Sequence, residues 1–127
     1  MTEDPELRKK TEETLDSIRE RLGFVPVVNQ VLSERPDLFL PTAEFSRALF
    51  EGDGAMDVKQ RHLCAVAAAT AICGEYCLRA QAMHAMDAGA TREEVLEAVT
   101  IGSYMAMTRS QSYAFRKYAE LFDIELE

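Results

Sequence analysis

Two closely spaced cysteines, Cys73 and Cys77, are the most reactive side chains of the sequence. They flank Gly74, where we expect one helix to end and the next to begin. A thiol at the start of a helix faces unsatisfied backbone amides and the positive end of the helix dipole, which favour the thiolate. Cys77 is therefore a candidate nucleophile. Cys73 is a candidate disulfide partner, provided that the chain bends between the two residues.

A disulfide between these cysteines would be strained, and a strained, accessible disulfide is reduced more easily than a structural one. That property suits a redox centre that cycles. The alternative is plain core packing, because free cysteines are among the most buried residue types. The third cysteine, Cys64, falls inside an apolar, alanine-rich stretch, and we expect it to be structural.

Histidines and an amide are expected in the same neighbourhood. If the helices on either side of Gly74 form an antiparallel hairpin, His62 comes close to Gln81 and His84. Cys77, Gln81 and His84 also share one helix face at three- and four-residue spacing. A thiol, an amide and an imidazole together suit general-base activation of the thiol. A polar interior network without chemistry is the alternative.

A metal site is a third interpretation, because Cys73, Cys77, His62 and His84 are of the types that bind zinc. Only the cysteine pair has a spacing typical of structural zinc sites. We therefore predict neither a metal nor another cofactor.

The elements that position these residues are all predicted to be helices, since no strand-length alternation occurs. Asp37 and Asp57 are expected to cap helices, and Thr91 with Glu94 forms a capping box. Tyr113, Phe115, Tyr118, Ala119 and Phe122 are expected on or near the buried side of the last helix. The predicted helices cover residues 5–22, 25–34, 37–50, 57–72 and 75–88, a helix from residue 91, and a last helix over 110–122.

The helix over residues 63–72 is apolar around its whole circumference and must be covered on all sides. A chain of 127 residues has room for one domain, which we assign to residues 1–127. A domain of this size encloses such a helix poorly by itself. We therefore expect a homo-oligomer.

The formal net charge of −8 argues against nucleic acid as a partner, because phosphate binding needs a basic surface. No stretch is long and apolar enough for a membrane span, and the acidic N-terminus does not resemble a signal peptide. We expect no membrane association and a cytoplasmic location.

Several segments together resemble the alkylhydroperoxidase D and carboxymuconolactone decarboxylase family. The resemblance covers roughly residues 38–122 and is most specific from Cys77 to Gly89. It rests on the sequences Val58-Lys59-Gln60-Arg61-His62-Leu63, Glu75-Tyr76-Cys77, Ala88-Gly89-Ala90-Thr91 and Glu93-Glu94-Val95.

The resemblance implies an alkylhydroperoxidase-like helical bundle with a central antiparallel hairpin, assembled as a trimer or hexamer. In the peroxidase branch it also implies a Cys-x-x-Cys pair activated by a Glu and a His. Cys77 matches the second, peroxidatic cysteine, but Gly74 occupies the first position and Cys73 lies one residue early. His62 stands at the position of the Glu and Gln81 at the position of the His.

These matches favour a thiol-dependent peroxidase or disulfide oxidoreductase that acts on a peroxide or disulfide and uses a thiol reductant. Cys77 is the expected nucleophile, Cys73 resolves it, and His62 with Gln81 supplies proton transfer and hydrogen bonding. Glu75, Tyr76 and His84 are possible supporting residues. A non-catalytic or small-molecule-binding member that keeps the oligomeric scaffold is the alternative, and a lactone decarboxylase-type enzyme is a further one.

Overall fold

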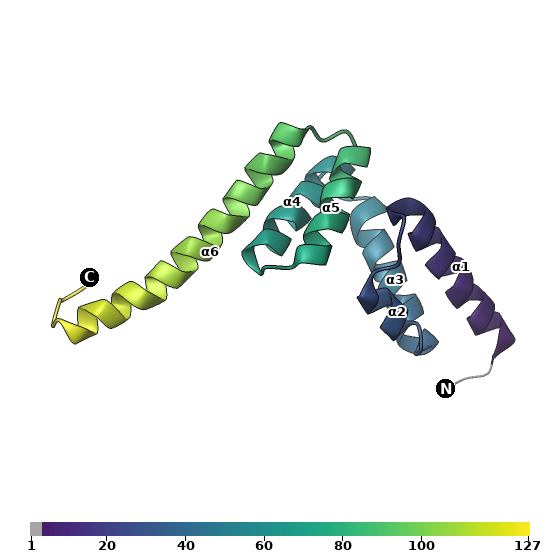
Figure 1. Cartoon of the computed structure of the whole chain (residues 1–127), viewed down its shortest axis with the longest axis horizontal. Coiled ribbons are helices and arrows are strands. Elements are labelled where there is room, and N and C mark those ends of the chain that lie inside the picture. Colours follow the sequence, from purple (N-terminus) through teal and green to yellow (C-terminus); the bar gives the residue numbers. More distant parts are fainter. Residues whose placement is uncertain (1–3) are drawn as a thin grey trace. The chain divides into compact units, whose positions relative to one another are not determined.

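The computed structural model describes residues 4–127, and helices joined by short connections make up this part of the chain (Figure 1). No strand occurs among the described residues, so the predicted all-α fold class is confirmed. The helices are α1 (Pro5–Leu22), α2 (Val27–Leu32), α3 (Pro36–Glu51), α4 (Val58–Ala71), α5 (Glu75–Asp87) and α6 (Arg92–Leu121).

Two compact units can be distinguished by their internal contacts. The first ends at Val58 and holds α1 to α3, and the second runs from Lys59 and holds α4 to α6. The assignment of residues 1–127 to one domain stays a prediction.

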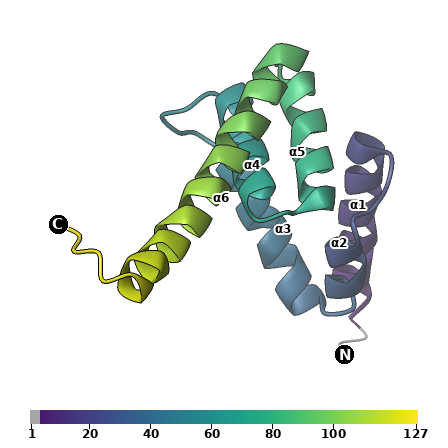
Figure 2. The ribbon, with the colours of Figure 1, turned by 60° about the vertical axis from the view of Figure 1, so that its left-hand side comes forward.

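In the first unit, α1 forms as its periodicity predicts. The Asp4 carboxylate caps the helix by accepting from the Glu6 amide, and Gly23 ends it in the left-handed conformation that glycine adopts most easily. Arg21 near the end of α1 pairs with Glu51 at the end of α3, at 3.1 Å. The two helices therefore run in the same direction, with α2 on the connection between them (Figure 2).

The start of α3 differs from the prediction. Asp37 was expected to cap the helix, but α3 begins one residue earlier at Pro36 and its cap position is Arg35. Proline suits the first helical position because it has no amide hydrogen to leave unsatisfied. Asp37 instead lies in the first turn and pairs with the Arg35 guanidinium at 2.6 Å. This pairing lowers the pKa of the Asp37 carboxyl.

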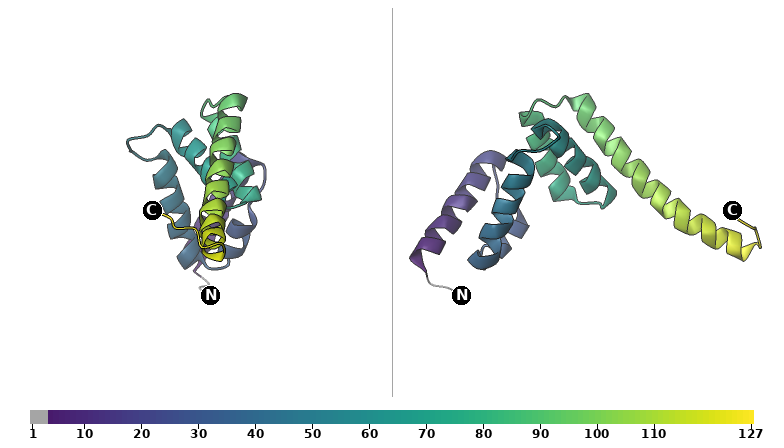
Figure 3. Two further views of the ribbon diagram at one scale, coloured as in Figure 1. Left: turned by 90° about the vertical axis from the view of Figure 1, so that its left-hand side faces the viewer. Right: turned by 180° about the vertical axis from the view of Figure 1, so that it is seen from behind.

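In the second unit, α4 and α5 form the predicted antiparallel hairpin, and α6 runs beside it (Figure 3). Lys59 in the first turn of α4 pairs with Glu94 in the first turn of α6 at 3.1 Å, so these two helices start side by side. Glu94 also accepts from the Thr91 amide, which completes the predicted capping box. The Thr91 amide and then the Lys59 ammonium hold the pKa of Glu94 below its ordinary value.

Small residues allow α6 to approach α4 closely. Gly102 is buried, and a Cβ atom there would overlap the Ala67 carbonyl oxygen and lie 2.9 Å from the Thr70 Cβ. Glycine in the middle of a helix costs about 0.5–1 kcal/mol relative to alanine. Here the close contact between the two helices requires it.

A single continuous helix replaces the two elements predicted between residues 91 and 122. α6 extends from Arg92 to Leu121 without a break at Ser110. No glycine or proline interrupts the chain between Ser103 and Leu121, and the Thr100, Ser103 and Thr108 hydroxyls bond back to carbonyls of the preceding turn. These polar residues therefore fit within the helix and do not end it.

The aromatic residues at the C-terminal end of α6 are not buried as predicted. Ala119 is buried, but Tyr113, Phe115, Tyr118 and Phe122 are all more than half exposed. The reason is length, because α4 ends near Ala106 of α6 and the last 15 residues of α6 extend roughly 22 Å further.

None of the described helices is long and apolar enough to cross a membrane.

Candidate functional site

The turn between α4 and α5 carries the cysteines. The Gly74 amide bonds to the Ala69 carbonyl at 2.8 Å and the Cys73 amide to the Thr70 carbonyl at 3.2 Å. This pair of bonds is a Schellman motif, which closes α4 and satisfies two of its terminal carbonyl groups. Its left-handed position, usually a glycine, is filled by Cys73 with φ of 58°.

A left-handed conformation at a residue with a side chain costs on the order of 1 kcal/mol, and such strain tends to occur at functional positions. The sequence places the helix break at Cys73-Gly74 but does not reveal which residue adopts this conformation. Glycine would be the usual choice, and here it takes the next position with φ of −83°.

Cys77 lies in the first turn of α5, as predicted. The cap residue of that helix is Gly74, which offers no side chain to the amides of the first turn. Cys77 is exposed, and so is its neighbour Tyr76. Its thiol therefore meets solvent beside the unsatisfied backbone amides at the start of α5.

The cysteines of the chain are free thiols, and Cys64, Cys73 and Cys77 are all exposed. Core packing therefore does not explain the Cys73 and Cys77 side chains. The expectation of a packed, structural Cys64 is not met either, since this thiol lies on the exposed side of α4 with Ala68.

Position 74 keeps the geometry of a Cys-x-x-Cys pair although no cysteine stands there. A Cβ built on Gly74 lies 3.5 Å from the Cys77 Cβ. Cβ atoms joined by a disulfide are about 3.5–4.5 Å apart. The backbone is thus arranged as the family motif requires, while the available thiol sits one residue earlier at Cys73.

His62, Gln81 and His84 come together in the hairpin, as predicted from its register. His62 is 6% exposed, and its Nδ1 lies 2.7 Å from the Gln81 Oε1. The His62 and His84 rings are stacked with centroids 5.0 Å apart.

The imidazoles and the thiols remain separate groups in this structure. No hydrogen bond joins either sulfur of Cys73 or Cys77 to another described residue. Glu75 lies between the cysteines in the first turn of α5 and is exposed. The sequence-predicted residues therefore form two groups, a pair of exposed thiols and a largely buried histidine–amide cluster.

A metal centre is not supported by the side-chain arrangement. Within residues 4–127, no three His, Cys, Asp or Glu side chains are placed to hold an ion together. The proposed zinc ligands Cys73, Cys77, His62 and His84 do not gather.

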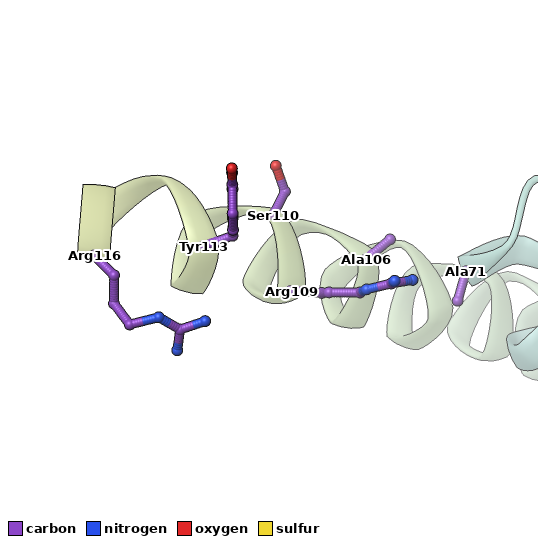
Figure 4. A pocket seen from close by; sticks show the side chains of 6 residues that line it. All are labelled: Ala71, Ala106, Arg109, Ser110, Tyr113 and Arg116. Carbon is purple, nitrogen blue, oxygen red and sulfur yellow. The ribbon is translucent and has the colours of Figure 1, made fainter. Parts of the chain in front are cut away.

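One open hollow lies away from the predicted site residues. It measures about 470 Å³ and is formed where α6 passes the end of α4 at Ala71. Tyr113 and Ser110 point to one side of α6, Arg116 points to the opposite side, and Arg109 runs along the helix toward Ala71, so these polar groups do not converge on one ligand (Figure 4). The cysteine turn is therefore the candidate site, and this hollow is not.

An all-helical unit with a thiol-bearing hairpin defines the class of protein, and comparison with known families identifies it. The carboxymuconolactone decarboxylase family model matches residues 36–120. Since the match covers well over half of the chain, the protein belongs to the carboxymuconolactone decarboxylase family. This family includes peroxidase-related and decarboxylase members. No curated protein and no solved structure matches the chain.

Proposed function

We propose that the protein is a thiol-dependent peroxidase or disulfide oxidoreductase in which Cys77 is the nucleophile and Cys73 resolves it. The observation that carries this proposal is the placement of two free, exposed thiols on either side of the α5 start. Cys77 lies in an uncapped first turn that favours a thiolate, and Cys73 lies in a strained turn directly before it.

The proposed cycle starts with attack of the Cys77 thiolate on the terminal oxygen of a hydroperoxide. An S–O bond forms, the O–O bond breaks, and the leaving alkoxide takes a proton to become an alcohol. The Cys73 thiolate then attacks the sulfenic sulfur, which forms the disulfide and expels hydroxide, and the hydroxide takes up a proton to become water. An external thiol reductant restores both thiols by exchange and is itself oxidised.

His62 is the candidate proton acceptor in this cycle, and Gln81 orients it. The hydrogen bond between Nδ1 and the Gln81 amide fixes the orientation of the imidazole ring. Hydrogen bonds to a catalytic base often form only when substrate binds, and we propose that His62 acts at that stage.

Substitution of single cysteines tests the proposal. We expect Cys77→Ser to abolish turnover of hydrogen peroxide or an organic hydroperoxide with a dithiol reductant. Cys73→Ser should leave one turnover and block the cycle, because the sulfenic acid forms but finds no resolving thiol. Cys64→Ser is the matched control, an exposed cysteine of the same chain whose loss should change nothing.

Unchanged turnover in Cys77→Ser would contradict the proposal. Equal loss in all three variants would point to an effect on folding, which the circular dichroism spectrum of each variant checks.

A second candidate is a non-catalytic or small-molecule-binding member of the family. It is favoured by the His62–Gln81 pair, since the two polar groups satisfy one another inside the hairpin and neither contacts a thiol. Competitive alkylation at neutral pH separates the two functions. An activated Cys77 reacts at least tenfold faster than the exposed Cys64, whereas ordinary thiols react at equal rates.

A lactone decarboxylase-type activity has the least support from the site, because Gln81 occupies the position of the His that works in that branch of the family.

A further inference from the structure

Three backbone hydrogen bonds hold the turn that carries the thiols. The Cys73 amide donates to the Thr70 carbonyl at 3.2 Å. The Gly74 amide donates to the Ala69 carbonyl at 2.8 Å, and the Glu75 amide donates back to the Cys73 carbonyl at 3.1 Å. The last bond gives Gly74 a φ of −83° and a ψ of 78°, the angles of an inverse γ-turn. The direction of the Cα–Cβ bond of Cys73 is therefore fixed by the backbone on both sides of it.

The direction that leads to Cys77 belongs to the next position of the chain. A Cβ on Gly74 would lie 3.5 Å from the Cys77 Cβ, within the range of disulfide-bonded cysteines. The Cys73 side chain starts from a Cα about 3.8 Å away, and its φ of 58° turns it differently from a side chain at position 74. The two sulfurs are accordingly free thiols in this arrangement of the turn.

We propose that formation of the Cys73–Cys77 disulfide opens the turn that closes α4. This inference rests on the proposed function, because that function pairs the two cysteines. In the oxidised protein, Cys73 leaves the left-handed conformation and takes the place that Gly74 now has at the start of α5. The bonds from the Cys73 and Gly74 amides to the last turn of α4 are then lost.

The left-handed conformation of Cys73 favours this change. A residue with a Cβ atom is less stable in that conformation than glycine is. Part of the free energy of the two lost hydrogen bonds is therefore recovered when Cys73 adopts an ordinary backbone conformation. A glycine at position 73 would gain nothing from the same change.

The side chains around the turn leave it room to move. Ile72 is 74% exposed and Tyr76 is 68% exposed, and Glu75 between the cysteines is exposed as well. The turn can therefore change its conformation without pulling a large side chain out of the core.

The redox cycle links the two forms of the turn. The Cys73 thiolate attacks the sulfenic sulfur of Cys77, hydroxide leaves, and the turn is open with the S–S bond in place. Thiol exchange with the external reductant then breaks the S–S bond, and the reductant is oxidised to its own disulfide. With two thiols restored, the amide bonds of Cys73 and Gly74 form again and the turn closes.

Amide hydrogen exchange of the full chain, followed by NMR, tests the proposal. A Cys64→Ser background leaves only the pair able to bond, and diamide serves as the oxidant because it requires no peroxidase activity. We expect the Cys73 and Gly74 amides to exchange roughly tenfold faster, or more, in the oxidised than in the reduced protein. The Val66 amide in the middle of α4 is the control and should exchange at the same rate in both forms.

Two substitutions at position 74 provide a matched pair of variants. Gly74→Pro removes the amide hydrogen that bonds to Ala69 and disfavours the left-handed conformation at Cys73, so the turn is open beforehand. Gly74→Ala keeps the amide, and its added methyl group meets only ordinary contacts. In glutathione redox buffers we expect the Gly74→Pro disulfide to be roughly tenfold harder to reduce than that of the wild type. Gly74→Ala should match the wild type.

Three results would overturn the proposal. The first is a Cys73–Cys77 disulfide in a protein whose Cys73 and Gly74 amides stay as protected as in the reduced form. The second is equal reducibility of the two position-74 variants, with circular dichroism showing that both are folded. The third is a diamide-treated protein in which peptide mapping finds no bond between the pair.

Peroxide turnover is measured separately. A protein that forms the bond and opens the turn, but turns over no peroxide, supports this inference and contradicts the proposed function alone. If Gly74→Pro does not fold, the amide exchange of the Cys64→Ser protein decides.

Discussion

A one-residue displacement separates the cysteines of this protein from the family motif. Cys73 occupies the left-handed position of the turn. The next position, whose Cβ would lie at disulfide distance from Cys77, is occupied by Gly74. The φ of Gly74 suits any residue, and a Cβ there meets nothing closer than 3.5 Å. The backbone can therefore accept a cysteine at position 74.

We predict that Gly74→Cys forms a disulfide with Cys77 readily, because the Cβ atoms already lie at disulfide distance. Its reduction potential should be lower than that of any Cys73–Cys77 bond, since less strain is stored. Titration against glutathione redox buffers with thiol trapping measures both potentials. A Gly74→Cys protein that retains three reactive thiols besides Cys64 after oxidation would contradict the prediction, and Gly74→Ser is the control for the added side chain.

For single residues, the sequence predicts which side chains lie close together better than it predicts the backbone conformation of each residue. The approach of His62 to Gln81 follows from counting residues on either side of a hairpin turn, and the structure places their polar atoms 2.7 Å apart. The left-handed conformation of Cys73 does not follow from any local pattern. It arises because the Schellman bonds fix which residue ends α4, and here that residue is not the glycine.

Single elements were predicted well where their ends carry capping chemistry. Gly23 ends α1 and the Thr91–Glu94 box starts α6 as expected, because both signals are local. The length of α6 was not predictable in the same way. Its hydroxyl residues can end a helix or bond within it, and only the folded chain decides between these outcomes.

The contact between α4 and α6 depends on Gly102, and we predict that Gly102→Ala destabilises the second unit. The added methyl group would overlap the backbone of Ala67, which cannot move without shifting α4. Such overpacking costs about 1–3 kcal/mol, more than alanine gains in helix propensity. Urea unfolding followed by circular dichroism measures the loss. Ser103→Ala, at the exposed neighbouring position, should cost far less.

Acid should weaken the ion pair between Lys59 and Glu94, which joins the first turns of α4 and α6. The pKa of Glu94 is lowered in the folded protein, so its contribution to stability is full above the ordinary pKa of about 4.3 and is lost as pH falls through the lowered value. We predict that Glu94→Gln flattens the decline of the melting temperature between about pH 5 and pH 3. Glu93→Gln, in the same turn, is the control and should leave the decline as steep as in the wild type.

For the whole molecule, the family and the helical class follow from the sequence, whereas the exposed apolar surface of α6 does not. Self-association was expected because α4 is apolar on all sides, and Cys64 and Ala68 do remain exposed on it. The larger apolar surface lies on α6. The aromatic residues between positions 113 and 122 were predicted to be buried, because their pattern is typical of a buried helix face. In the structure they are exposed, because the pattern does not identify the surface that would cover them.

The extension of α6 beyond α4 also bears on how the helix holds its shape. Past Ala106 the helix has no neighbouring helix within its unit, and serine, threonine and aromatic residues, which are weaker helix formers, make up six of its last 15 residues. A segment of this length is marginal as an isolated helix in water, so we expect it to fray from its free end. Amide hydrogen exchange should therefore be faster in residues 107–121 than in the first half of α6, which packs closely on α4 at Gly102.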